Sequence, residues 1–474
     1  MSKIIESINI QGSIYTGDDV SKYALDFGKT ITKKPLAVAN TTSAEDIIKI
    51  IAVAKKHSVP LSIRGAGHSC YGQTLCNGGI VINNISSKPQ FKVHSESVEV
   101  NTRTRWLDLE NALNAMGRSL PVLTDYLTFS VGGTLSVGGY GVRSVTEGSQ
   151  VDQVQKLQII TWNGDILWCS PDENEEIFRY ALCGMGQLGI IEKVIMRTTP
   201  YFPKPILHHY RHPSLEHLVA TFESFLDENN SFPDYFEAAM VGENFLNFSH
   251  PIVNRILKTG THLLLGKKII GSRYGFHNKE RINFEKSELL RNIKPKISTI
   301  KDNYALFSHR KQDKYVSSLH RQKRIWTDYM LNYEGLCKFT SFMEEELQDK
   351  KLANYLGVLY FLGNRKPKKK IHFAFEPASG IKDRMTFLVG VFYAVPENDT
   401  TGVNYVREAL KRSLQKVVSL GGRPYLYGWN DLDNKMRNSL YGDSCEKMIN
   451  LCQELDPEGV GKLLPSFTGE TNAV

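Results

Sequence analysis

The chain has 474 residues, of which 41% are hydrophobic and 23% are charged, and its net charge is +8 at pH 7. This length exceeds what one compact core usually holds, so it predicts two domains or one domain with a large cap. The composition excludes disorder over most of the chain. No apolar run approaches the roughly 20 residues that cross a bilayer, so no membrane span is expected. The N-terminal residues lack the apolar core of a secretory signal, which predicts a cytoplasmic protein.

Many basic residues lie beyond the first half of the chain, in the segments Lys267 to Arg324 and Arg365 to Lys370. Neither segment shows a recognition motif for nucleic acid, and charge runs of this kind are usually solvated faces. Nucleic-acid binding is therefore not expected. The seven cysteines lack the Cys/His spacing of a zinc site, so no metal site is predicted.

Short helices and strands alternate through the first 200 residues. The pattern predicts an amphipathic helix from Ser43 to Val59 with Ser43 as its N-cap, because an acidic first turn follows this serine. Further predicted elements are strands at 60–64, 79–83 and 97–102, a helix at 106–116, a hairpin from 157 to 169, a helix at 177–182 and a strand at 190–196. This mixture favours an α+β fold.

A domain boundary is predicted near residue 200, where Pro200, Pro203 and Pro205 follow one another. Proline interrupts both helices and strand ladders and is common in connections between domains. Beyond this boundary the sequence predicts helices at 334–347 and 405–420 and a strand at 387–395.

Two glycine-rich segments carry the strongest functional signal. The first runs from Arg64 to Ser69 after a predicted strand, and the second runs from Ser130 to Gly141. Loops without Cβ atoms let backbone N–H groups approach a pyrophosphate closely. Two such loops predict a single dinucleotide held between them.

A third glycine segment, Gly184 to Gly189, matches the GxGxxG pattern of dinucleotide-binding Rossmann folds. The fingerprint needs a strand, a turn and a helix in that order, whereas here a helix is predicted before the glycines and a strand after them. An NAD site at this segment is therefore not expected.

The ordered motifs resemble those of the vanillyl-alcohol oxidase superfamily of FAD-linked oxidases, and most of all those of cytokinin dehydrogenases. The motifs are Arg64 to Ser69 with Gln73 nearby, Leu123 to Leu127, Val131 to Ser136, and Gly184 to Ile191. The resemblance implies a PCMH-type FAD-binding domain of two α+β subdomains over residues 1–200, completed by about 441–474. It also implies a substrate domain over 201–440, with an antiparallel sheet flanked by helices.

His68 is the residue that the resemblance places at the covalent attachment of FAD, through one bond to the 8α carbon of the flavin. A second link would need cysteine where this chain has Tyr126. Without the motif, a histidine in a turn would be read as a solvent-facing or capping residue. The cofactor-binding residues implied with it are Arg64, Gly65, Ala66, Gly67, Ser69, Gln73, Thr124, Asp125, Tyr126, Val131, Gly132, Gly133, Ser136, Gly139, Gly189, Ile190 and Ile191.

Asp125 is the expected catalytic base, because the family's matching aspartate accepts the proton of the substrate amine. Dehydrogenation of a C–N bond sends hydride to flavin N5 while the nitrogen loses a proton, and a carboxylate at that N–H lowers the barrier. Apart from the resemblance, an aspartate beside a glycine-rich loop is often a turn or cap residue. The family has tryptophan where this chain has Leu123, so the shape of the substrate wall does not carry over.

The substrate pocket is predicted from less specific signals in the C-terminal third. Trp326 and Asp328 stand where the family carries Trp-Leu-Asn, and a segment with Tyr425, Tyr427 and Trp429 matches a tyrosine-rich segment near the flavin. Aromatic clusters of this kind are more often core than pocket.

Two acidic residues, Asp234 and Glu237, open the implied substrate domain. Acidic residues near the start of a strand are more often solvent-facing, so no direct role is assigned to either.

The predicted function is that of an FAD-dependent oxidoreductase acting on the C–N bond of a cytokinin-like N6-substituted adenine. Dioxygen or a quinone would reoxidise the flavin. One alternative is a tailoring oxidase acting on a sugar, an alcohol or a secondary metabolite, which Leu123 and the divergent C-terminal third support. Another is a flavin-binding or partner-binding protein without turnover, with the basic segments as its interaction surface.

Overall fold

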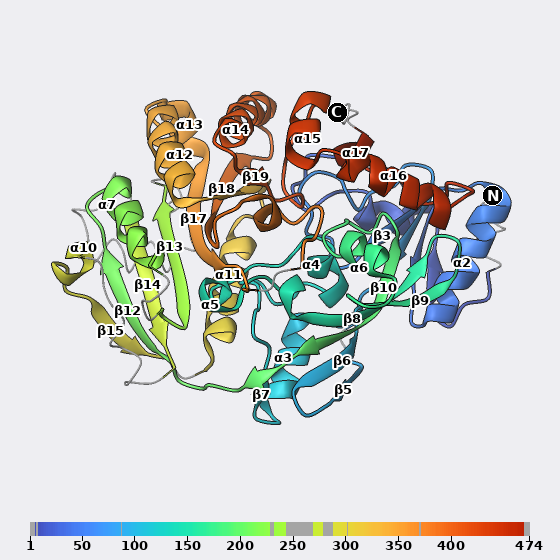
Figure 1. Ribbon diagram of the computed structural model, residues 1–474. Coiled ribbons are helices and arrows are strands. Elements are labelled where there is room, and N and C mark those ends of the chain that lie inside the picture. Colours follow the sequence, from blue (N-terminus) through green and yellow to red (C-terminus); the bar gives the residue numbers. More distant parts are fainter. Residues whose placement is uncertain are drawn as a thin grey trace.

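The computed structural model describes residues 5, 8–86, 88–227, 232–242, 269–277, 288–300, 302–368 and 371–468. Both ends of the chain, Lys267 and Lys268 of the first basic segment, and Lys369 and Lys370 of the second therefore lie outside the described residues. Helices and sheets are mixed along the chain, which makes this an α+β fold (Figure 1).

A four-stranded sheet forms first, in the order β1-β2-β4-β3, where β2 and β3 both run parallel to β4. Its strands are β1 (Ser13–Tyr15), β2 (Ala37–Asn40), β3 (Leu61–Arg64) and β4 (Ile80–Asn83). Helix α2 (Ala44–His57) begins as expected, because Ser43 accepts a hydrogen bond from the Asp46 N–H. The apolar face of this helix is buried in the core that includes the sheet.

A five-stranded antiparallel sheet follows, in the order β5-β6-β10-β8-β9. Its strands are β5 (Phe91–Val93), β6 (Ser97–Asn101), β8 (Val154–Thr161), β9 (Ile166–Cys169) and β10 (Gly189–Arg197). Helix α3 (Trp106–Asn114) buries Trp106, Leu109 and Leu113. Helix α6 (Glu175–Ala181) precedes the third glycine segment and β10 follows it, the order of elements that argued against a Rossmann site.

We had expected the whole second glycine segment to be an open loop, but part of it is helical. Residues Val131–Leu135 form a short helix, α4, and the Ser130 hydroxyl accepts a hydrogen bond from the Gly133 N–H at its start. Ser130 thus acts as an N-cap, which lets one turn of helix form even across two glycines.

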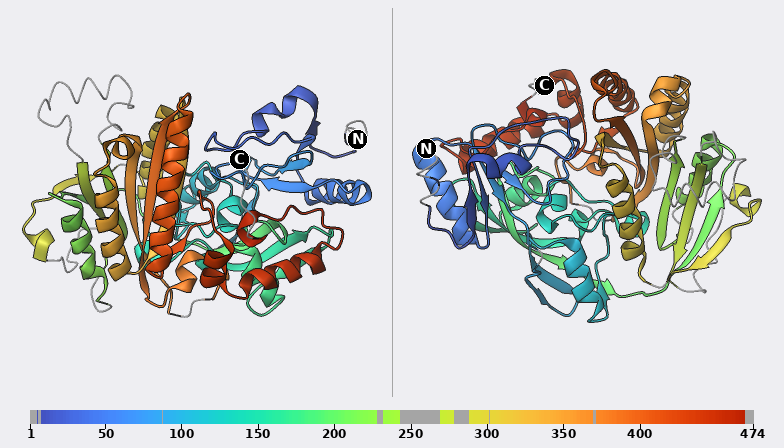
Figure 2. Two further views of the ribbon diagram at one scale, coloured as in Figure 1. Left: turned by 90° about the horizontal axis from the view of Figure 1, so that it is seen from above. Right: turned by 180° about the vertical axis from the view of Figure 1, so that it is seen from behind.

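The C-terminal half is built on an eight-stranded antiparallel sheet, in the order β15-β12-β14-β13-β17-β18-β16-β19. Its strands are β12 (Ile206–Arg211), β13 (Tyr235–Val241), β14 (Ile269–Phe276), β15 (Lys296–Thr299), β16 (Gln322–Leu331), β17 (Leu356–Arg365), β18 (Met385–Pro396) and β19 (Arg423–Pro424). One face is covered by helices α7 (Leu215–Ala220), α12 (Tyr333–Glu346), α13 (Lys350–Tyr355) and α14 (Thr400–Ser419), as both views in Figure 2 show. The other face is turned toward the N-terminal half.

Helix α11 (Tyr304–Ser318) lies between the two halves near the centre of Figure 1. Its Asn303 cap donates to Glu110 of α3 over 2.7 Å, and its His309 Nδ1 accepts from the Leu127 N–H over 3.3 Å. These contacts fix the sheet of the C-terminal half against the N-terminal half.

The C-terminal helices α15 (Asn434–Tyr441), α16 (Ser444–Leu455) and α17 (Pro465–Thr468) lie against the N-terminal half, in red in Figure 1. The Leu61 N–H of β3 donates to the Val460 carbonyl over 2.7 Å, and Gln187 Oε1 accepts from the Leu464 N–H over 2.9 Å. The chain end thereby contacts the strand that leads into the first glycine segment.

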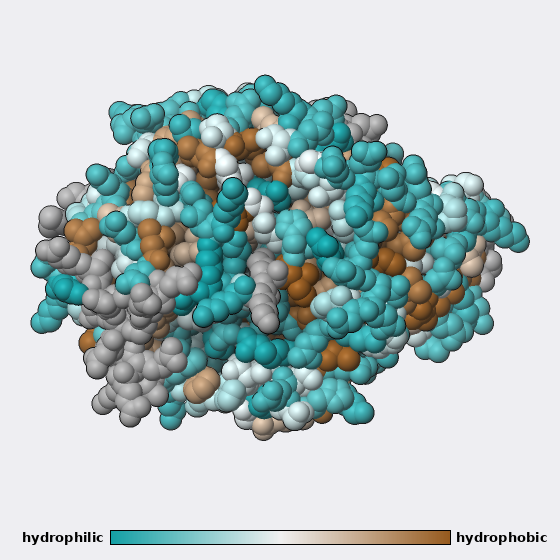
Figure 3. Space-filling model, in the orientation of Figure 1, coloured by the Kyte–Doolittle hydropathy of each residue, from teal (hydrophilic) through white to brown (hydrophobic). Residues whose placement is uncertain are grey.

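Hydrophilic residues cover most of the molecular face in Figure 3, and hydrophobic residues form small separate areas there. Within the part of the chain that the structure describes, no helix combines the length and the apolar character needed to cross a bilayer.

Candidate functional site

A deep cavity of about 260 Å³, counted as the space open to the centres of water molecules, lies where the two halves meet. Both glycine-rich segments line it from the N-terminal half. Strands β16, β17 and β18 of the eight-stranded sheet contribute the remaining wall, together with α11 and the segment after β19. Such junctions between two parts of a chain are the usual place for a cofactor and its substrate.

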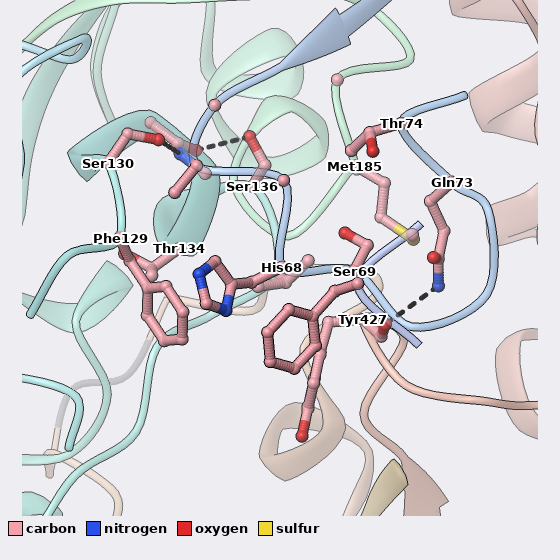
Figure 4. A pocket seen from close by; sticks show the side chains of 18 of the residues that line it. His68, Ser69, Gln73, Thr74, Phe129, Ser130, Thr134, Ser136, Met185 and Tyr427 are labelled. Atoms are coloured by element: carbon pink, nitrogen blue, oxygen red, sulfur yellow. Dashed lines mark hydrogen bonds between the residues drawn. The ribbon is translucent and has the colours of Figure 1, made fainter. Parts of the chain in front are cut away.

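The His68 side chain points into this cavity from the first glycine segment (Figure 4). Its ring centroid lies 4.3 Å from that of Phe27, 4.7 Å from that of Phe129 and 5.1 Å from that of Tyr126. Burial lowers the pKa of His68 to about 3, and the positive charge of Arg324 contributes further. The imidazole is therefore neutral at pH 7, so it can use a ring nitrogen as a nucleophile.

The two glycine segments are in direct contact at Gly65. A Cβ atom at this position would collide with the Ser130 hydroxyl at the start of α4, so only glycine lets the two segments meet. Gly67 has a φ of +71°, and a Cβ atom there would collide with the Arg64 guanidinium. The resulting cradle of exposed backbone fits the pyrophosphate of a dinucleotide such as FAD.

Most of the predicted cofactor-binding residues line this one cavity. They are Gly65, Ala66, Gly67, His68, Ser69, Gln73, Thr124, Asp125, Tyr126, Gly132, Gly133, Ser136, Gly189, Ile190 and Ile191. Gln73 also joins the two halves, because its Nε2 donates to the Tyr427 carbonyl over 3.0 Å, as the dashed line in Figure 4 shows.

Three of the predicted cofactor-binding residues, Arg64, Val131 and Gly139, lie outside the lining. Arg64 lies over the ring of Tyr23, and Val131 is fully buried in the core. The Gly139 N–H donates to the Tyr425 hydroxyl over 2.8 Å, so this glycine supports a residue of the cavity wall.

Asp125 lies in the cavity with its carboxyl group held by two hydroxyl groups. Ser308 of α11 donates to Oδ1 over 3.3 Å, and Tyr360 of β17 donates to Oδ2. Burial, together with the negative charge of Glu237, raises the pKa of Asp125 to about 7. This carboxyl group can therefore exchange a proton near neutral pH.

Glu237 belongs to the same polar cluster, and our expectation of a solvent-facing residue is wrong. Its side chain is buried, and its carboxylate lies 3.0 Å from the Tyr360 hydroxyl and 2.5 Å from that of Tyr304. Although burial opposes the charge, the ion pair with Arg273 and the nearby Lys311 lower the pKa of Glu237. Glu237 thus stays ionised and favours the protonated form of Asp125.

Asp234 is also buried rather than exposed, and its Oδ2 accepts a hydrogen bond from the His277 N–H over 2.8 Å. It fixes the start of β13 and does not line the cavity.

The first basic segment is not simply a solvated face, which corrects a second expectation. Arg273 pairs with Glu237, and Arg324 lies over the ring of Phe27 beside His68. Burial lowers the pKa of Lys311 to about 8. Sequence could not separate Arg273 and Arg324 from their neighbours, because only strand pairing brings them against these partners.

Four of the five predicted substrate residues line the cavity: Trp326, Asp328, Tyr425 and Tyr427. Trp429 does not, because its buried ring packs against Tyr71 with ring centroids 4.3 Å apart. Leu123 is likewise buried in the core and outside the lining.

Further cavity residues were not found from sequence, among them Phe27, Trp162 and Lys462. Lys462 follows the last residues that pair with β3, and burial lowers its pKa to about 8. Its place at the end of the chain gave no signal, because only the returning C-terminal segment brings it to the cofactor side.

Residues 35–170 match the model of a family described as "FAD binding domain". This range contains both glycine-rich segments and ends just after β9. The class of the site follows from this match: residues 35–170 resemble an FAD-binding domain, and the glycine cradle fits that cofactor.

Comparison with individual proteins gives a more specific resemblance. An uncharacterized oxidoreductase from the fasciation locus of Rhodococcoides fascians is 36% identical over 39% of this chain and 43% of its own length. Cytokinin dehydrogenase 10 of Oryza sativa subsp. japonica is 31% identical over 41% of this chain and 38% of its own length. Cytokinin dehydrogenase 1 of Arabidopsis thaliana is 33% identical over 41% of this chain and 35% of its own length. The chain is thus cytokinin dehydrogenase-like over about two fifths of the length of these relatives.

Proposed function

We propose that this protein is an FAD-dependent oxidoreductase that dehydrogenates a small molecule at a C–N bond. The observation that carries the proposal is the presence of the Asp125 carboxyl group, held by Tyr360 and Ser308, in the same cavity as His68 and the glycine cradle. A protein that only stored flavin would not need a proton acceptor there. When bound, FAD supplies the acceptor for the two electrons that leave the substrate carbon.

Asp125 takes the proton that the substrate nitrogen loses. The Tyr360 and Ser308 hydroxyl groups orient the carboxylate, and a pKa of about 7 matches a base that must accept and then release a proton near neutral pH. The product of the first half is an imine, which water hydrolyses. With an N6-allylic adenine as substrate, hydrolysis gives adenine and an aldehyde.

His68 is proposed as the covalent tether of FAD through a single bond. Its neutral imidazole, packed between aromatic rings, offers a ring nitrogen in a fixed orientation. Tyr126 stands where a second link would need a thiol, which supports attachment by one bond only.

The substrate class that we propose is a cytokinin-like N6-substituted adenine, with dioxygen or a quinone as the final electron acceptor. Aromatic and aliphatic side chains of the strand wall, such as Trp326, Leu362, Leu388 and Phe392, suit the apolar part of such a molecule. A second candidate is oxidation of an alcohol or a sugar. It is favoured by Asp328, a second buried carboxyl group where the family has asparagine.

One experiment tests the cofactor and its attachment together. The purified protein should be yellow, and the colour should remain in the pellet after acid precipitation. In His68→Ala the colour should pass to the supernatant. A colourless wild-type protein, or colour released from it by acid, would contradict the proposal.

The substrate class is tested by anaerobic mixing of the flavin-loaded protein with isopentenyladenine. Bleaching of the visible spectrum is the expected result. Failure to bleach, together with bleaching by a panel of alcohols or sugars, would select the second candidate. A loaded protein that no donor bleaches would be a flavin-binding protein without turnover.

A further inference from the structure

The strand wall of the cavity carries a second buried carboxyl group, that of Asp328 on β16. Its side chain is 3% exposed and lines the cavity. The Tyr427 hydroxyl donates to Oδ2, and no other hydrogen bond to this carboxyl group comes from the residues that the structure describes. Because Asp328 lines the cavity, its Oδ1 offers a hydrogen-bond acceptor to a ligand there.

Strand pairing relates Asp328 to the Asp125 cluster. On the neighbouring strands β17, β18 and β16, Tyr360 pairs with Gly390, and Gly390 pairs with Asp328. Directly opposed residues project from the same face of a sheet, so these three form one row across the cavity wall. Because neighbouring strands lie about 4.8 Å apart, the Cα atoms of Tyr360 and Asp328 are separated by about 10 Å.

Gly390 determines where the Asp328 carboxyl group lies. A Cβ atom at residue 390 would come within 2.7 Å of Asp328 Oδ1 and 2.8 Å of Phe392 Cζ. The carboxyl group therefore leans over the glycine, along the row toward Tyr360. Any larger residue at 390 would push it aside.

We propose that Asp328, held by Tyr427 and leaning over Gly390, is a second polar subsite that accepts a hydrogen bond from a hydroxyl or amine group of the substrate. The inference rests on the proposed function, in which Asp125 and Tyr360 bind the reacting N–H at the other end of the row. Beside this row the wall is apolar, because Leu362 and Leu388 pair with each other two residues further along the strands. The substrate is then a small molecule with two donor groups joined by a short apolar segment, such as an allylic amine with a terminal hydroxyl group.

The test uses two probes that differ by one oxygen: isopentenyladenine and its analogue with a hydroxyl group on the terminal carbon of the side chain. Each is mixed anaerobically with the flavin-loaded protein, and the concentration dependence of bleaching gives Kd and the limiting rate constant. In the wild type the hydroxylated probe should bind about tenfold more tightly, as expected for one added hydrogen bond. This preference should vanish in Asp328→Leu.

Two further variants separate binding from folding. Asp328→Asn keeps an oxygen acceptor and should retain much of the preference, whereas Gly390→Ala displaces the carboxyl group and should reduce it. Flavin content and the visible spectrum of each variant report whether the cavity has formed.

Equal Kd values for the two probes in the wild type would overturn the subsite while leaving the proposed function intact, because both probes still bleach the flavin. A preference that survives in Asp328→Leu would do the same. If neither probe bleaches the wild-type protein, the proposed substrate class and the subsite fall together.

Discussion

The cavity has two walls that are built in different ways. On the cofactor side, the glycine segments present backbone atoms, and the contacts that matter, such as Gly65 against Ser130, join residues within one matched domain. On the substrate side, single side chains come from strands β16, β17 and β18 and from helix α11, among them Asp328, Tyr360 and Gln312.

This difference indicates which wall determines the substrate specificity of the protein. A backbone cradle accepts the same dinucleotide whatever the neighbouring side chains are, so it can stay constant while the function changes. A wall made of separate side chains can be altered one residue at a time, as the aspartate at position 328 illustrates.

The largest effect on the reaction rate is expected from a substitution that removes the proposed base and leaves the flavin bound. Asp125→Asn removes the base but keeps the shape of the side chain and the hydrogen bonds from Tyr360 and Ser308 in reach. The rate constant of flavin bleaching by isopentenyladenine should fall by about 10²–10⁴, the usual contribution of a general base. Anaerobic stopped-flow absorbance measures it. Flavin content should match that of the wild type, and an unchanged rate would remove Asp125 from the mechanism.

The next effect should fall on the cofactor wall alone. Gly65→Ala places a methyl group against the Ser130 hydroxyl, so flavin content should drop by about tenfold as the two segments are forced apart. The ratio of visible to ultraviolet absorbance measures this content. Ser130→Gly in the same chain removes the colliding atoms, and the double variant should regain flavin. Loss of flavin that the second change does not restore would count against the cradle.

A smaller effect is expected in the pH dependence. Asp125 acts as a base only when it is deprotonated, so the bleaching rate should fall as the pH drops below about 7. Glu237→Gln removes a negative charge that raises this pKa, so the acidic limb should move to lower pH by about one unit. Rate constants measured from pH 5 to 9 in both proteins check the shift. A limb that stays in place would show that burial alone sets the pKa of Asp125.

The smallest effect on activity is expected from Trp429, which lies outside the cavity. Trp429→Phe should lower the free energy of unfolding by about 1–2 kcal/mol, because it leaves a void beside Tyr71. Denaturant unfolding measures this loss. The Kd of isopentenyladenine should not change, whereas Trp326→Phe in the cavity wall should weaken binding. Equal effects of the two changes on Kd would show that the aromatic segment acts as one unit.

Motifs of adjacent residues predicted the elements around the glycine segments. The first glycine segment follows directly after a strand, and the predicted order of a helix before Gly184 and a strand after it is confirmed. The helical turn α4 was missed, because glycine-rich composition favours a loop and only the Ser130 cap offsets it.

Burial of charged side chains was the part that sequence predicted worst. Glu237 and Arg273 were assigned to solvent, as the usual behaviour of their residue types suggests. They lie at directly paired positions of β13 and β14, where the buried Glu237 and the half-buried Arg273 neutralise each other. A pairing of this kind does not exist until the two strands meet.

By itself, then, the sequence determined the elements that bear the cofactor cradle and the residue proposed to hold the flavin, because backbone conformation around glycine and a helix cap depend on near neighbours. Only the tertiary structure decided which carboxyl groups meet at the cavity wall. Asp125 and Asp328 line the cavity, and Glu237 lies behind it against Tyr360. Burial raises the pKa of both aspartates, and the charge of Glu237 raises that of Asp125 further, because the sheet closes over the FAD-binding domain.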